Sequence, residues 1–234
     1  WEPTVRRFVS APSGHDACGP MRSSAHTFRT PSVDPQNTNH IAFKKPNYAV
    51  EGGLARYLER HGRNTRVPIA YEDLLRHDGL MAQQGPDGKE TLWTTVILRP
   101  SELEDVHERL VELYQVLVGY GRALPYLRVA SIDFCGYGNI QPFRIKILNL
   151  INDNHDYYYI KKADASRVYG LELEHLLSPN KINYICTGTT LVEEHIIGVP
   201  GDDFMQDPRK YGGNFNAVRL CKEFVKFNER CFVR

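Results

Sequence analysis

The stretch YYYIKKADASRVYGLELEH, residues 157–175, carries the strongest structural signal in the chain. Its aromatic first part predicts a β-strand that ends in a pair of lysines. A short connection then leads into a helix over 166–177, which carries Glu172 and Glu174. A strand followed directly by a helix allows a strand lysine to meet a carboxylate on the helix. Because strand side chains alternate, Lys161 is the lysine that shares a face with the tyrosines of this stretch.

Four further strands are predicted around this stretch. The segments 129–134 and 143–150 precede the strand 157–162, and the segments 182–186 and 191–197 follow the helix. Glycine- and asparagine-rich turns separate the first three strands, which predicts an antiparallel meander. The order β-β-β-α-β-β predicts the α+β class, with a mostly antiparallel five-stranded sheet and one packed helix.

The region 41–127 is predicted to be a mainly helical extension. Apolar side chains at helical spacing predict a helix over 47–61, with Gly62 at the position of a terminating glycine, and a second short helix over 71–77. Several cationic side chains lie close together near the first helix: Arg56, Arg60, His61, Arg63 and Arg66. They fit either a solvated surface that complements the helix C-terminus or an anion site.

Residues 92–98 are predicted to be a strand or an extended segment. The following sequence, Ser101-Glu-Leu-Glu104, has the pattern of a capping box, in which the serine hydroxyl and Glu104 satisfy free N–H groups. Leucine and valine residues then recur at steps of three and four up to Gly119, which predicts an amphipathic helix packed on the core.

The two ends of the chain differ from the middle. Residues 1–40 are rich in Ser, Pro, Thr, His and Asn, and we expect an irregular or disordered segment, because so few apolar groups cannot offset the ordering entropy. Residues 201–234 are expected to form a loop and a final helix capped by Asn214 or Asn216. The chain begins at Trp1 and ends at Arg234 within a periodic element, so we interpret it as a fragment of a longer protein.

Composition excludes several classes of partner. The 29 basic and 28 acidic residues almost cancel, which does not favour binding to a nucleic-acid backbone. No apolar run reaches the roughly 18–20 residues that span a bilayer. The five cysteines form no C-x-x-C pair, and they are expected to be reduced thiols in a cytoplasmic protein.

A resemblance to a known family rests on three features. These are the order of the elements from residue 128, the glycine turn Cys135-Gly-Tyr-Gly-Asn139, and Lys161 at the end of the third strand. In these features the chain resembles the protein-kinase-like superfamily, specifically its divergent bacterial members. The resemblance covers about residues 128–234. It implies a kinase-like N-lobe over 128–200, followed by a hinge-following loop and the start of a C-lobe helix over 201–234.

The resemblance assigns roles to individual residues. It implies that Lys161 binds the α- and β-phosphates of ATP, and that either Glu172 or Glu174 orients this lysine, with a slight preference for Glu174. Gly136 and Gly138 would lie in the loop that covers the phosphates, although an ordinary hairpin turn explains them equally well. Backbone groups of three residues in the fifth strand, where it leads to the interlobe hinge, would pair with adenine: Glu194, His195 and Ile196.

The expected function is therefore ATP-dependent phosphotransfer in an intact protein, with ATP and Mg²⁺ as cofactors. The family's catalytic loop and its metal-binding residues would lie beyond Arg234, so we assign no catalytic residue to this chain and expect it to be inactive alone. The alternative is a pseudokinase-like module that binds a protein partner without catalysis. The expected partners are a nucleotide and a protein substrate or partner.

Overall fold

A computed structural model describes residues 46–119, 124–137, 140–178, 181–199, 204, 206–211 and 217–233. From Asn47 onward, the described residues belong to one compact unit. Several expectations lie outside the described residues, namely those for residues 1–40, Gly138, the helix caps Asn214 and Asn216, and the chain end at Arg234.

The elements follow the predicted order closely. In chain order they are α1 (Gly52–Arg60), α2 (Tyr71–Leu74), β1 (Gly79–Gln84), β2 (Glu90–Ile97), α3 (Leu103–Val118), β3 (Leu127–Phe134), β4 (Phe143–Asn149), β5 (His155–Lys162), α4 (Ala165–Leu177), β6 (Tyr184–Thr187), β7 (Thr190–Glu194), the 3-10 turn η2 (Pro208–Tyr211) and α6 (Ala217–Val233).

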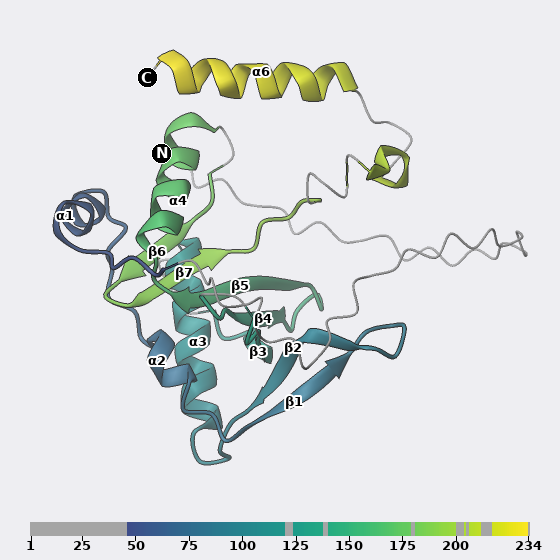
Figure 1. Ribbon diagram of the computed structural model, residues 1–234. Coiled ribbons are helices and arrows are strands. Elements are labelled where there is room, and N and C mark those ends of the chain that lie inside the picture. The colour runs from purple at the N-terminus through teal and green to yellow at the C-terminus, as the bar shows by residue number, and fades with distance from the viewer. Residues whose placement is uncertain are drawn as a thin grey trace, which may run out of the picture. The chain divides into compact units, whose positions relative to one another are not determined.

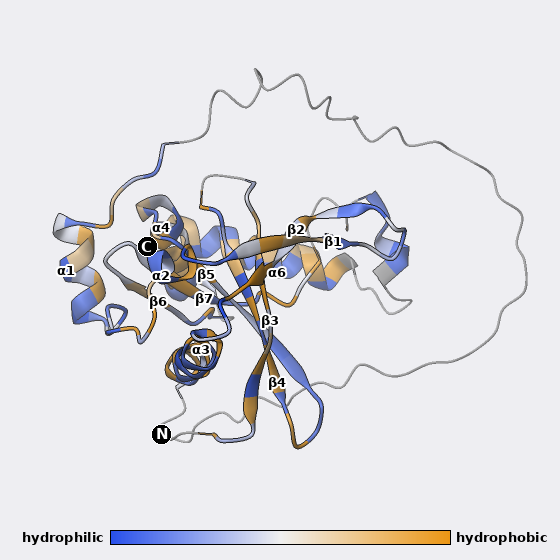
Figure 2. Ribbon diagram, turned by 90° about the horizontal axis from the view of Figure 1, so that it is seen from below, coloured by the Kyte–Doolittle hydropathy of each residue, from blue (hydrophilic) through white to orange (hydrophobic). Residues whose placement is uncertain are grey.

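The strands form one antiparallel sheet in the order β1-β2-β3-β4-β5-β7-β6 (Figure 1). This confirms the α+β class, but the predicted count of five strands is wrong, because seven strands form the sheet in the part of the chain that the structure describes. The two additional strands lie in the region 41–127, which is therefore less helical than predicted: β2 lies where residues 92–98 were predicted to be a strand or an extended segment, and β1 was not predicted. The β2–β3 pairing is short and joins only Thr94 to Phe134 and Thr95 to Asp133. Figure 2 shows β1 and β2 running across the direction of β3 and β4.

One face of the sheet is the main hydrophobic core, and α3 covers it. Apolar side chains from α3 and from the central strands are buried together, among them Leu110, Leu113, Ile132, Phe143, Ile145, Tyr158, Ile160 and Val192. Each such side chain contributes roughly 1.5–3 kcal/mol when it leaves water. The Tyr158 hydroxyl donates to the Leu110 carbonyl over 2.8 Å, which ties β5 to α3.

The opposite face is polar over the centre of the sheet. Cross-strand partners share a face, and the register pairs Arg144 with Tyr159, Tyr159 with Glu193, and Lys161 with Leu191. Helix α4 covers the β5-β7-β6 end of this face. Its side chains belong to a second buried cluster made of Leu58, Ala163, Val168, Leu171, Tyr184, Cys186 and Leu191.

The helix ends follow their capping chemistry. Gly119 ends α3 with φ 76°, and Gly62 follows α1 with φ +67°, as the terminating glycines predict. The predicted capping box at Ser101 is wrong, because α3 begins at Leu103 with Glu102 as its N-cap. The Glu102 carboxylate instead forms an ion pair with Arg99 over 2.7 Å, and the Glu102 N–H donates to the Arg99 carbonyl over 2.9 Å in the turn that leads into the helix.

Candidate functional site

Lys161 lies at the end of β5 on the polar face of the sheet, as the strand alternation predicts. Its side chain is only 12 % exposed, and its amine forms an ion pair with Glu193 on the neighbouring strand β7. Glu193 is more deeply buried, at 2 % exposure. The predicted strand lysine is therefore held by a carboxylate, but this carboxylate comes from a strand and not from the helix.

A second cation binds the same carboxylate. Arg167, in the first turns of α4, donates from Nε to Glu193 over 2.9 Å. We call Lys161, Arg167 and Glu193 the β5–β7 triad. Two cationic side chains share one carboxylate in this triad, so it carries a net positive charge when the Lys161 amine is protonated; the Lys161 side chain is largely buried, Glu193 is buried, and Arg167 is 36 % exposed. Buried charge of one sign favours a counter-ion, and phosphate oxygens suit both an ammonium and a guanidinium.

The environment of the triad shifts the ionisation of its lysine. Burial lowers the pKa of the Lys161 amine to about 7, and the nearby Arg167 guanidinium acts in the same direction. The Glu193 carboxylate pairs with both cationic side chains. The amine therefore changes charge near neutral pH, and an added anion would favour its charged form.

Aromatic side chains lie beside the triad on the same face. The Lys161 amine lies 5.1 Å from the ring centre of Tyr159. The Tyr159 hydroxyl is 3.0 Å from His195 Nδ1, and the Tyr159 ring centre lies 6.3 Å from that of Trp93 on β2. The Arg144 guanidinium stacks over Trp93 at 4.3 Å. The polar face thus combines cations with flat apolar rings, a combination that suits a nucleotide.

Glu172 does not pair with Lys161, which corrects one of the two predicted partners. It faces α1 and β6, where it accepts hydrogen bonds from Tyr57 at 2.8 Å, from Arg63 Nε at 3.1 Å, and from Tyr184. Burial acts to raise the pKa of this carboxyl, but the hydrogen bonds from Tyr184, Tyr57 and Arg63 outweigh it and lower the pKa. The carboxylate is thus satisfied on the side of α4 that faces away from the triad.

Glu174, the preferred partner in the sequence prediction, is partly buried on α4. Lys161 forms its ion pair with Glu193 and not with this residue. Seven residues separate Arg167 from Glu174, which places both side chains on nearly the same face of the helix, about 10 Å apart along its axis. Glu174 therefore points toward the side of the triad without belonging to it.

The glycine turn connects β3 to β4 as predicted. Cys135 N–H donates to the Pro142 carbonyl over 3.0 Å, and the Gln141 side chain donates to the Gly136 carbonyl over 3.3 Å. Gly136 has open space on the side where a Cβ would stand, apart from the Phe134 ring at 3.7 Å. Gly138 lies outside the described residues.

The three residues predicted to bind adenine through their backbone lie at the end of β7: Glu194 is its last residue, and His195 and Ile196 follow it. The N–H of Glu194 donates to the Asn183 carbonyl over 3.0 Å, and the N–H of His195 donates to the Tyr157 carbonyl over 3.2 Å. These two donors are therefore occupied within the sheet. Of the three, Ile196 is the one whose N–H has no backbone partner among the described residues.

Sequence reasoning missed Arg167, Glu193 and the role of Arg63. Glu193 could not be predicted as the partner of Lys161, because the register between β5 and β7 decides whether Glu193 or Glu194 shares a sheet face with this lysine. The arginine cluster was assigned to solvent or to an anion, whereas Arg63 is an internal partner of Glu172. The sequence did carry one signal for Arg167. It lies in the first turn of the helix that follows the strand of Lys161, and a side chain there can reach the same sheet face as that lysine.

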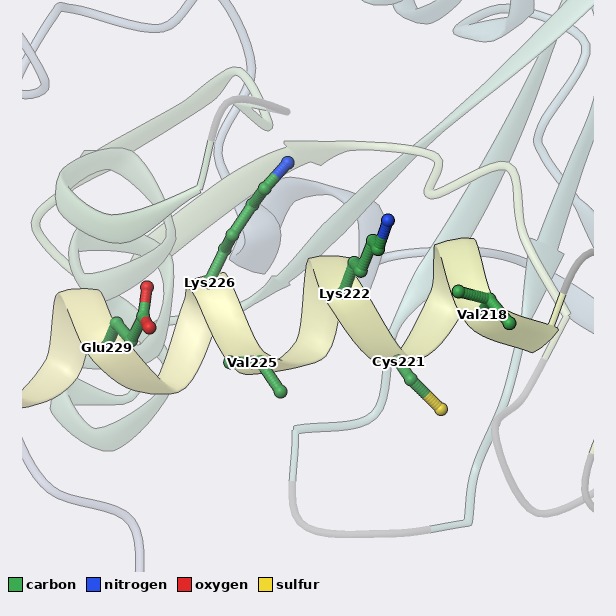
Figure 3. Close-up of a pocket in the computed structure, with 6 residues that line it drawn as sticks. All are labelled: Val218, Cys221, Lys222, Val225, Lys226 and Glu229. Carbon is green, nitrogen blue, oxygen red and sulfur yellow. The ribbon is translucent and has the colours of Figure 1, made fainter.

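Two hollows elsewhere do not include the triad. One, of about 490 Å³, runs along α6, where Val218, Cys221 and Val225 lie on one side and Lys222 and Lys226 project from the other (Figure 3). The second, of about 910 Å³, lies between α3 and the start of β3. The hollow along α6 is one side of an amphipathic helix. Neither hollow combines cationic and aromatic side chains around a buried carboxylate, as the site around Lys161 does.

Comparison with family models, with curated proteins and with solved structures finds no match to this chain. Within the described residues, none of the helices combines the length and the apolar character that crossing a bilayer requires.

Proposed function

We propose that this chain carries the nucleotide-binding lobe of a protein-kinase-like phosphotransferase, with Lys161 and Arg167 binding the phosphates of ATP. The observation that carries the proposal is the sharing of one buried carboxylate, Glu193, by these two cations. In the intact protein the reaction would transfer the γ-phosphoryl group of ATP to a hydroxyl group. For this chain alone we expect nucleotide binding without transfer.

The arrangement of elements supports this proposal. A meander of three antiparallel strands, β3-β4-β5, is followed by α4 and by a hairpin whose second strand, β7, lies beside β5. Lys161 stands on the sheet face that α4 covers, so the strand lysine and the helix are on the same side, as the resemblance implies. The β3–β4 turn with Gly136 belongs to the same meander.

The chemistry of the donors fits ATP better than it fits a bare metal ion. An ammonium and a guanidinium provide point-charge and planar donors for phosphate oxygens. Among the described residues, no group of three His, Cys, Asp or Glu side chains could hold a metal ion. We therefore assign Mg²⁺ to the phosphates of the nucleotide and to no described residue.

The direct test is the affinity for Mg²⁺-ATP after Lys161→Met. A charged hydrogen bond contributes about 1.5–3 kcal/mol, so the dissociation constant is expected to rise about 10- to 100-fold. Arg167 still pairs with Glu193 in this variant, and the fold is therefore expected to persist. Calorimetric titration of the wild type and of the variant measures the difference.

The adjacent Lys162 provides a matched control. Lys162 is exposed and its side chain leaves the strand on the opposite face. The variant Lys162→Met removes the same charge one residue away, and its dissociation constant is expected to stay within about twofold of the wild type. A wild-type protein that does not bind Mg²⁺-ATP, or an equal loss in both variants, would contradict the proposed function.

The pKa of Lys161 predicts how binding depends on pH. The amine binds phosphate as a cation, and it is charged in the free protein only below about pH 7. Above this pH, binding must take up a proton, so affinity falls by up to about tenfold for each pH unit. Phosphate groups titrate near about pH 6 and are already ionised. Titrations at pH 6.5, 7.5 and 8.5 should show this decline in the wild type and not in Lys161→Met.

A second candidate function is a protein-binding module without catalysis. An apolar stripe on α4 favours it, because Tyr169, Leu173 and Leu176 lie at helical spacing and are 57 %, 54 % and 51 % exposed. Exposed apolar groups in one row favour contact with another protein surface. Absence of nucleotide binding, together with partner binding that is lost in Leu173→Asp, would favour this function over the first.

A further inference from the structure

Arg63 connects the segment after α1 to two other parts of the fold. Its Nε donates to Glu172 on α4, and its Nη2 lies 3.1 Å from His175 Nδ1 on the same helix. Its carbonyl accepts the N–H of Cys186 in β6 over 2.9 Å. The single residue Arg63 therefore connects the segment after α1 to both helix α4 and the edge strand β6.

Helix α1 strengthens this connection. The Tyr57 hydroxyl donates to Glu172, and Leu58 is buried at 1 % exposure in the cluster that contains Val168 and Leu171 of α4. We call Tyr57, Arg63 and Glu172 the α1 clamp. Because Glu172 is 7 % exposed, loss of the Arg63 charge would leave a buried carboxylate with only hydroxyl donors.

Helix α4 belongs to both charged clusters. Glu172 anchors its middle to the α1 clamp, and Arg167 anchors its first turns to Glu193 in the β5–β7 triad. Five residues separate Arg167 from Glu172, so their side chains leave the helix about 140° apart. Helix α4 is thus fixed at two positions. Because the helix is stiff, a displacement at Glu172 would also move Arg167.

We propose that the α1 clamp is a positioning element for the phosphate site, which holds α4 so that Arg167 stands beside Lys161. Arg63, Tyr57 and Glu172 are positioning residues, since none of them is part of the β5–β7 triad. This inference rests on the proposed function for its binding readout, but its structural consequence for α4 can be measured without any nucleotide.

The test combines hydrogen–deuterium exchange with affinity for Mg²⁺-ATP in Arg63→Met. Amide exchange over residues 165–177 is expected to speed up, including in the first turns around Arg167. Coupling through such a network changes affinity by about three- to thirty-fold, so the dissociation constant should rise by this factor. Arg63→Lys keeps the charge without the planar fork, and it should restore part of the affinity.

Controls separate positioning from a general loss of stability. Arg60→Met removes an exposed cation from the last turn of α1, and it should change neither readout. In an Arg167→Met background, Arg63→Met should have no further effect on affinity, because the positioned group is already absent. If Arg63→Met unfolds the chain, Tyr57→Phe provides the milder variant, which removes one hydrogen bond.

The outcomes distinguish the two proposals. Faster exchange confined to α1 and residues 61–66, or an affinity loss that is equally large in the Arg167→Met background, would overturn the positioning role. A wild-type protein that fails to bind Mg²⁺-ATP would reject the proposed function alone. Exchange over 165–177 would still show whether the clamp holds the Arg167 end of α4.

Discussion

Glu193→Gln is expected to lower the free energy of unfolding by about 3–5 kcal/mol at pH 6, where Lys161 is charged, because it leaves this buried amine and the partly buried Arg167 guanidinium without their shared counter-ion. Glutamine has nearly the same shape as glutamate, so little packing is lost. Lys161 and Arg167 both point at the replaced group, and each can satisfy only part of its charge with a neutral amide. Urea denaturation followed by circular dichroism measures this loss.

Glu194→Gln is the matched control, since Glu194 is the next residue on the same strand. One carboxylate oxygen accepts from the Asn183 backbone N–H at 3.0 Å and the other from the Asn183 side chain at 2.8 Å, so the single oxygen of glutamine can keep one of these two hydrogen bonds. The expected cost is about 1 kcal/mol. Equal costs for the two variants, or a cost below about 1 kcal/mol for Glu193→Gln, would show that the triad is not a buried charge cluster.

A second large effect is expected from Phe143→Ala, at about 3–5 kcal/mol of unfolding free energy. Phe143 begins β4 and is fully buried on the α3 face. Its ring centre lies 4.8 Å from that of Phe134 and 5.6 Å from that of Tyr71. Truncation therefore leaves a cavity where three elements meet, and strands held by backbone hydrogen bonds cannot close it. Thermal and urea unfolding curves measure the loss.

The control for this variant is Ile151→Ala in the turn between β4 and β5. Ile151 is 73 % exposed, so its truncation removes few contacts and should cost less than about 0.5 kcal/mol. A cost for Phe143→Ala similar to that of Ile151→Ala would mean that the ring is not packed as the structure places it.

The sequence predicted the elements around Lys161 well, because their signals are local. Aromatic strands, glycine turns and a helix with apolar spacing are patterns of neighbouring residues, and β3, β4, β5 and α4 all lie where these patterns place them. The strand β1 was missed because Gly79-Leu-Met-Ala-Gln-Gln84 has little intrinsic strand preference. It becomes a strand by pairing with β2, which is a tertiary effect.

The candidate site was predicted less well, because its contacts join distant residues. The predicted pairing of Lys161 with a helix glutamate depended on which face each glutamate occupies, and Glu172 is drawn away by Arg63, which lies 109 positions earlier. The true partner of Lys161 depends on strand register, and a shift by one residue would replace Glu193 by Glu194. No local pattern encodes either relation.

The crossing of the chain from β5 to β7 has a consequence for folding kinetics. The β3–β4, β4–β5 and β6–β7 pairs are hairpins that can form within microseconds, whereas the β5–β7 pair must wait until α4 and β6 are in place. We therefore expect Glu193 to reach Lys161 and Arg167 after these hairpins have formed. Contacts made after the transition state slow unfolding without speeding folding, so we expect the charged triad to extend the lifetime of the native state.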